Sequence, residues 1–184
     1  GITDQKTFFD IRGRVLRLEI DGNQDGYMDS VQYYEKETLR RLEKDTDDDR
    51  HMDCIVYIKD GKRTRQERCD ISGMIYQITV FDNTGLPTEM KKDTTGSAFF
   101  DTVYIFENGE PVLSTKDIDE NGIINVRQTF QNNLPVEKTV DADENGKIEE
   151  IKSLAAEFNS NPTSSNAEDL AKQSVNAERI FQNY

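Results

Sequence analysis

Acidic side chains recur in short turns of this sequence at a spacing that suits a calcium ion. The run Asp21-Gly-Asn-Gln-Asp-Gly-Tyr-Met-Asp29 has side-chain oxygens at positions 1, 3, 5 and 9 of the turn. Ca²⁺ takes about six to eight oxygen ligands, and a carbonyl at position 7 and a glycine bend at position 6 complete such a loop. The sequence therefore predicts a calcium loop with the ligands Asp21, Asn23, Asp25, Tyr27 and Asp29.

Three further turns follow the same pattern with small departures. The turn at 45–53 has acids at positions 1, 3, 5 and 9, but Arg50 replaces the glycine. The turns at 117–125 and 141–149 keep the glycine and have asparagine at position 5, so their lower charge predicts weaker binding. The expected ligands are Asp45, Asp47, Asp49, His51 and Asp53; Asp117, Asp119, Asn121 and Asn125; and Asp141, Asp143, Asn145 and Glu149. The turns at 70–73 and 93–96 lack the extra acids and are not expected to bind metal.

Two alternatives compete with a β-hairpin calcium loop. Asp, Asn and Gly form turns without any metal, because their side chains cap nearby backbone N–H groups. Against this, each close pair of carboxylates costs about 1 kcal/mol even in a high dielectric, and a bound dication would reverse that cost. An EF-hand needs a bidentate Glu at position 12, where this sequence has Gln32, Val56, Gln128 and Lys152. We therefore expect loops between strands.

A 24-residue spacing organises the chain into similar units. Pro87, Pro111 and Pro135 are separated by this interval, as are Asp93, Asp117 and Asp141. Asn/Asp/Gly turns alternate with the acidic turns, and the intervening segments are of strand length with period-2 alternation. The stretch 31–44, rich in helix-forming residues, is predicted to be strand, turn and strand because it shares this register.

The sequence therefore predicts a mainly β protein. We expect an antiparallel β-hairpin repeat array of about six units over residues 1–157, a polar linker over 158–166 and one C-terminal α-helix over 167–184.

Two short motifs resemble known repeat families. The runs Val80-Phe-Asp-Asn-Thr-Gly-Leu-Pro and Ile105-Phe-Glu-Asn-Gly-Glu-Pro are similar to the aromatic hairpins of bacterial YD/RHS-type and MORN-type repeat proteins. This resemblance, over roughly residues 8–152, implies an antiparallel sheet used as a shell or interaction scaffold. The acidic turns resemble the calcium loops of integrin-type propeller repeats and, where a helix follows, of dockerins and EF-hands.

Composition limits the classes of partner. The 184 residues have 34% hydrophobic and 32% charged residues, which predicts a thin core. The formal charge of -13 makes nucleic acid and anionic membranes poor partners, and we expect neither nucleic-acid binding nor membrane insertion.

The two cysteines, Cys54 and Cys69, flank one predicted hairpin. Their index sum places them within a residue of direct pairing, so the sequence predicts a cross-strand disulfide, with two buried thiols as the alternative. A disulfide would imply an oxidising, extracytoplasmic location such as a periplasm or cell surface, where calcium is abundant.

No catalytic motif is present, and His51 lies alone in an acidic turn. We therefore expect a non-enzymatic, exported, acidic bacterial module that binds a protein partner or serves as a structural scaffold, with calcium as its possible ligand. Tyr33, Tyr57 and Tyr104 are the candidate partner-binding residues, with packing in the sheet core as the alternative. The other hypotheses are an EF-hand or dockerin-like docking module and a carbohydrate-active enzyme that uses a carboxylate pair.

Overall fold

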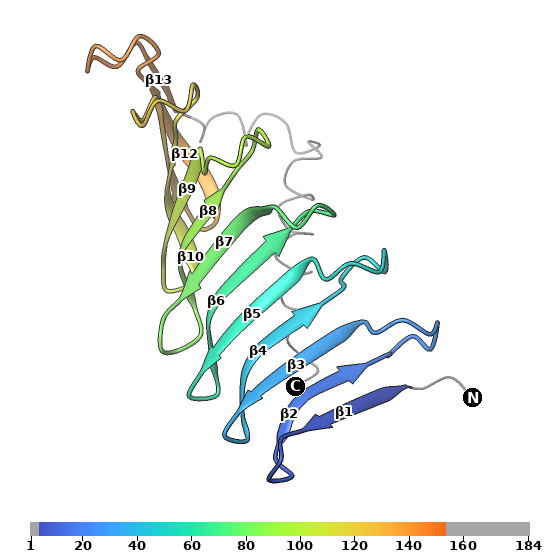
Figure 1. The fold of residues 1–184 in the computed structure, drawn as a ribbon. Coiled ribbons are helices and arrows are strands. Elements are labelled where there is room, and N and C mark those ends of the chain that lie inside the picture. Colours follow the sequence, from blue (N-terminus) through green and yellow to red (C-terminus); the bar gives the residue numbers. More distant parts are fainter. Residues whose placement is uncertain (1–3, 154–184) are drawn as a thin grey trace.

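The chain forms one antiparallel sheet in which every strand pairs with its neighbours in sequence. The structure, a computed structural model, describes residues 4–153. It contains 13 strands in the spatial order β1 to β13. Figure 1 shows β1 to β7 side by side in this order. The strands are β1 (Gln5–Phe9), β2 (Val15–Ile20), β3 (Ser30–Glu35), β4 (Thr38–Lys44), β5 (Cys54–Lys59), β6 (Lys62–Cys69), β7 (Ile75–Phe81), β8 (Pro87–Lys92), β9 (Thr102–Glu107), β10 (Glu110–Lys116), β11 (Val126–Gln131), β12 (Leu134–Val140) and β13 (Glu150–Ser153).

These strands confirm the mainly β, hairpin-based prediction. The stretch 31–44 is β3 and β4, so its pairing with neighbours overrides its helix propensity. The predicted linker and helix at 158–184 lie outside the described residues. Within residues 4–153 there is no helix, so none that could span a membrane.

At one end of the sheet, short turns with adjacent β-bulges connect the two strands of each hairpin. Pro87, Pro111 and Pro135 each pair with a phenylalanine of the preceding strand, next to a register shift in the hairpin. The three prolines thus have equivalent surroundings. A bulge at this place leaves room for proline, which has no N–H to give to the ladder.

The two faces of the sheet have different chemistry. One face carries the buried cluster of Leu42, Cys54 and Val56, with Ile58 packed against it. On the other face Arg41 pairs across the strands with Tyr33 and Tyr57. The core is thin, as composition predicts: the buried hydrophobic side chains among the described residues are Val31, Leu42, Cys54, Val56 and Cys69.

The structure does not contain the predicted disulfide. Cys54 and Cys69 are free, buried thiols. Cys54 pairs with Arg68, one residue away from the expected partner, and because side chains alternate along a strand Cys69 points to the opposite face. Burial raises the pKa of the Cys54 thiol, which keeps it protonated and unreactive. The inference of an oxidising location from this disulfide therefore loses its basis.

Candidate cation-binding loops

Nine-residue loops connect strands at the end opposite to the short turns (Figure 1). They cover residues 21–29, 45–53, 93–101, 117–125 and 141–149. Each joins two strands, so the flanking helices of an EF-hand or dockerin are absent from the described part of the chain. The turn at 93–96, which lacks the extra acids, belongs to a loop of the same length as the others.

Position 1 of every loop is an aspartate that accepts the backbone N–H of position 6. The donors and acceptors are Gly26 to Asp21 at 2.9 Å, Arg50 to Asp45 at 2.7 Å, Ala98 to Asp93 at 2.8 Å, Gly122 to Asp117 at 2.7 Å and Gly146 to Asp141 at 3.1 Å. This bond closes the loop on itself.

Position 9 accepts the backbone N–H of position 2 in each loop. The pairs are Gly22 to Asp29 at 2.6 Å, Thr46 to Asp53 at 2.7 Å, Thr94 to Asp101 at 2.7 Å, Ile118 to Asn125 at 2.6 Å and Ala142 to Glu149 at 2.5 Å. Asp, Asn and Glu all serve here, so the fold of the loop needs an oxygen acceptor at position 9 and no particular charge.

Position 5 accepts the N–H of position 7, and again the acceptor varies. Asp25 and Asp49 act through carboxylates, Asn121 and Asn145 through amides, and Ser97 through its hydroxyl. The bond lengths lie between 2.8 and 3.1 Å.

The backbone conformation is also shared. Position 4 has positive φ in each loop, from 60° at Glu144 to 81° at Gly96. Position 6 has positive φ as well, including 77° at Arg50 and 71° at Ala98. The absence of glycine at these two residues therefore did not change the bend, although a side chain there is strained.

Three of the loops bring acidic groups close together. Each of the following triads has one ligand atom per residue within 4.8 Å of the others and could hold a metal ion: Asp21, Asp25 and Asp29; Asp45, Asp47 and Asp49; Asp141, Asp143 and Glu149. The loop at 117–125 has asparagine at positions 5 and 9, so it supplies fewer charges.

Two carboxylate oxygens in these triads have no partner. Asp45 Oδ1 and Asp141 Oδ1 are buried, and neither has a hydrogen bond among the described residues. Burial and repulsion by Asp49 raise the pKa of Asp47 above its ordinary value. The triad at 45–49 therefore holds excess negative charge in the protein alone.

The loop without the added acids behaves in the opposite way. In loop 93–101, Thr95 and Ser97 occupy positions 3 and 5. Burial acts to raise the pKa of Asp93, but hydrogen bonds from Ala98, Gly96 and Thr95 outweigh it and hold the pKa below its ordinary value. The pKa of Asp101 is lowered too, since bonds from Thr102 and Thr94 overcome burial.

Neighbouring loops touch one another through position 4. Asp48 Oδ1 accepts a hydrogen bond from Asn23 of the preceding loop at 3.4 Å. Glu120 accepts one from Thr95 at 2.6 Å, and Glu144 accepts one from Asn121 at 2.8 Å. The Arg50 guanidinium also lies 3.8 Å from the centre of the Tyr27 ring. The loops thus form one connected row, except at the short β6–β7 turn.

The remaining predicted ligands lie within these nine-residue loops, at the loop positions that the sequence predicts. The Asn23 side-chain oxygen accepts the N–H of Asp25 at 2.9 Å, and Asp143 accepts the N–H of Asn145 at 3.2 Å. The His51 ring lies beside Asp49, with Nδ1 3.4 Å from the carboxylate. Asp119 has its pKa raised by burial and by the nearby Glu144.

The three candidate partner-binding tyrosines do not lie together. Tyr33 and Tyr57 flank Arg41 on one face, and Tyr104 is on the other, 6.2 Å from the ring of Phe130. Sequence reasoning missed the residues that surround the first two. Arg17, Arg41 and Arg65, spaced by 24 residues, each pair with the glutamate two positions on.

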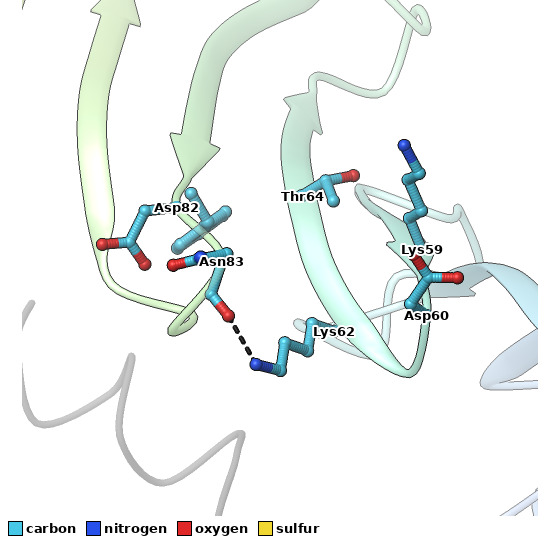
Figure 2. Close-up of a pocket in the computed structure, with 7 residues that line it drawn as sticks. Lys59, Asp60, Lys62, Thr64, Asp82 and Asn83 are labelled. Atoms are coloured by element: carbon cyan, nitrogen blue, oxygen red, sulfur yellow. Dashed lines mark hydrogen bonds between the residues drawn. The ribbon is translucent and has the colours of Figure 1, made fainter.

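An open groove of about 400 Å³ lies between the turns at 60–61 and 82–85 (Figure 2). Lys62 crosses it and donates to the Asn83 carbonyl at 2.6 Å. Asp82 is held by its own turn, and the hydrogen bond from the Thr84 side chain leads the interactions that lower its pKa. The groove brings together no catalytic pair.

Comparison with known proteins shows no family. No family model matches the chain, and no curated protein matches it. Among solved structures, S. aureus TarM in complex with fondaparinux, alpha-GlcNAc-glycerol and UDP is similar over 60% of this chain, with 11% identity and a TM-score of 0.44. The complex of accessory secretory proteins 1, 2 and 3 from Streptococcus pneumoniae is similar over 76%, with 16% identity and a TM-score of 0.40. The chain spans about a fifth of each, with 21% and 22% of their lengths covered.

Proposed function

We propose that the chain is a non-enzymatic β-hairpin repeat module that serves as a protein-binding scaffold and that its acidic loops bind calcium. Loop 93–101 supports the metal part most directly. It makes the same bonds to positions 1, 5 and 9 and has the same positive φ at positions 4 and 6, with Thr95 and Ser97 at positions 3 and 5. Acids at these positions in the other loops are therefore not needed for folding, and they serve something else.

A cation accounts for those extra acids. Asp45, Asp47 and Asp49 repel one another in the protein alone, and Asp45 Oδ1 is buried without a partner. A hard dication favours clustered carboxylate oxygens, and calcium tolerates irregular geometry better than magnesium. Exposed loops of this kind suit affinities of about 10⁻⁴–10⁻³ M, which function in an extracytoplasmic space. We propose such a location for this protein.

The protein-binding part is supported by the face that carries Tyr33, Arg41 and Tyr57. These side chains are half-buried and form a continuous row across strands β3 to β5, with Arg41 5.4 Å from the Tyr33 ring and 6.0 Å from the Tyr57 ring. Tyrosine and arginine are among the residues enriched at the energetic centres of protein interfaces.

Calorimetric titration tests the metal part. Calcium should release or absorb heat on binding and raise Tm, with stabilisation of about 2.7 kcal/mol at a hundredfold excess over Kd. The double variant Asp25→Asn, Asp49→Asn should weaken this response at loops 21–29 and 45–53, because asparagine keeps the bond to position 7 and removes the charge; loop 141–149 keeps its triad. Asp60→Asn, in the short turn at the other end, is the matched control. Neither heat nor a Tm shift at about 10 mM calcium would remove the metal from the proposal.

A further inference from the structure

A row of basic residues runs along the sheet beside the loops. Lys44, Arg68, Lys92 and Lys116 lie at or next to the ends of β4, β6, β8 and β10, at intervals of 24 residues. Cross-strand pairing places them on one face: Lys44 opposite Cys54, Cys54 opposite Arg68, and so on to Lys116.

Acids of the loops neutralise two of these residues. Arg68 lies 3.5 Å from Asp53, and Lys116 lies 3.6 Å from Asp101. In both cases the acid is position 9 of the loop preceding the neighbouring strand. Where position 9 is the neutral Asn125, the basic residue is replaced by Val140. A basic residue at the end of the strand is thus found where position 9 of the facing loop is acidic, and it is missing where position 9 is neutral.

Lys92 breaks this rule. The β6–β7 connection is a short turn, and Tyr76 takes the place of the position 9 acid, since its carbonyl accepts the N–H of Asp93. Asp70 of that turn bonds to its own Ser72 and Met74. Among the described residues the Lys92 ammonium has no hydrogen bond and no ion pair. Its pKa is lowered by burial and by Arg68, so the fold holds an unmatched cation there.

We propose that Lys92, with Arg68 beside it, receives the carboxylate of an acidic side chain from a partner protein, at the place where the row of acidic loops is interrupted. The pairs Arg68–Asp53 and Lys116–Asp101 are the internal template for this contact. Gln77 lies between Arg68 and Lys92 in the ladder; its amide nitrogen donates to Thr79 Oγ1 at 3.4 Å and has a second N–H for the incoming carboxylate. This inference names the chemistry of the partner and rests on the protein-binding function proposed above.

NMR titration of the protein with ¹³C-labelled lysine tests the contact. The probe is a soluble peptide of alternating aspartate and serine, compared with an asparagine–serine peptide and with free acetate. The aspartate peptide should shift the Lys92 signal and bind the wild type more tightly than Lys92→Met, by about tenfold. Lys92→Arg should retain binding. Lys62→Met is the control, because Lys62 already donates to the Asn83 carbonyl (Figure 2).

A second variant supplies the acid within the chain. In the Tyr76→Asp variant the new carboxylate should pair with the Lys92 ammonium and raise Tm. It should also weaken binding of the aspartate peptide by about tenfold. Equal binding by the wild type and Lys92→Met, or equal binding of the two peptides, would overturn the inference; saturation by acetate alone would reassign the site to a free carboxylate and overturn the partner contact. All titrations include a chelator, so failure of the calcium proposal leaves this result unaffected.

Discussion

Loops 45–53 and 93–101 share the positive φ of positions 4 and 6 and have opposite electrostatics. Their backbones differ at the position 9 N–H, which donates to the Lys44 carbonyl in the first loop and to the Phe99 carbonyl in the second. In both, position 1 accepts the N–H of position 6 and position 9 accepts the N–H of position 2. The first has acids at positions 3 and 5, and the pKa of Asp47 is raised by burial and by Asp49. The second has hydroxyls there, and its two acids have lowered pKa values. Two acceptors therefore define the loop, and the other acids are additions to it.

The largest expected effect comes from removing a defining acceptor. Asp101 is only 2% exposed and accepts bonds from the N–H and hydroxyl of Thr94. Asp101→Ala should lower the free energy of unfolding by about 2–4 kcal/mol, because these donors and Lys116 lose a buried partner. Urea denaturation measures it. Ser97→Ala in the same loop should cost far less, and equal losses would show that the two positions are not distinct.

The pH dependence follows from the same acids. The pKa values of Asp93 and Asp101 are lower in the folded protein than the ordinary value of about 3.9. Their contribution to stability is therefore complete above that value and is lost as the pH falls through the folded pKa values. Urea midpoints measured from about pH 5 to pH 2 should decrease, and Asp101→Asn should reduce this slope. An unchanged slope would assign the acid sensitivity to other groups.

A smaller gain is expected at position 6. Ala98 has φ of 71°, whereas Gly26, Gly122 and Gly146 occupy this position in three other loops. Ala98→Gly should stabilise the protein by about 0.5–1 kcal/mol, since relief of the left-handed strain exceeds the added chain entropy. Thermal unfolding measures this change. A destabilised variant would mean that the methyl group makes contacts more valuable than the strain.

The smallest effect concerns an added acid. Because the folded pKa of Asp47 is raised, its ionised form destabilises the protein above that pKa. Asp47→Asn should give a small rise in Tm when calcium is chelated and a weaker response when calcium is added. Differential scanning calorimetry with and without a chelator separates the two. A lower Tm in the chelator would show that Asp47 supports the loop after all.

The sequence was sufficient to predict the hairpins and the nine-residue loops with acids. The equivalent prolines and the strands at 31–44 follow from turn residues and period-2 patterns, which are local signals. Loop 93–101 was recognised only as a degenerate copy, because it lacks acids at positions 3 and 5. The pair Asp93 and Asp101, eight residues apart, is the signal that all five loops share in the form of an acceptor at positions 1 and 9.

The face of the sheet on which each side chain lies was harder to predict, for a geometric reason. A shift of one residue in register moves a side chain to the other face of a sheet. Cys69 was expected to face Cys54, and such a shift places it on the opposite face. Register shifts beside the turns, as between Tyr57 and Ile58, are not visible in a period count. The ion pair between Lys116 and Asp101 likewise could be identified only from the cross-strand register.

Because each strand in the described chain pairs only with its sequence neighbours, the sheet has no long-range closure. Such a topology has low contact order, so hairpins can nucleate independently and growth can proceed in either direction. Melting should begin at the outermost strands and travel inward, and amide exchange should slow progressively from β1 towards the middle of the array. Deleting one internal hairpin would shorten the ribbon while leaving the flanking strands able to join.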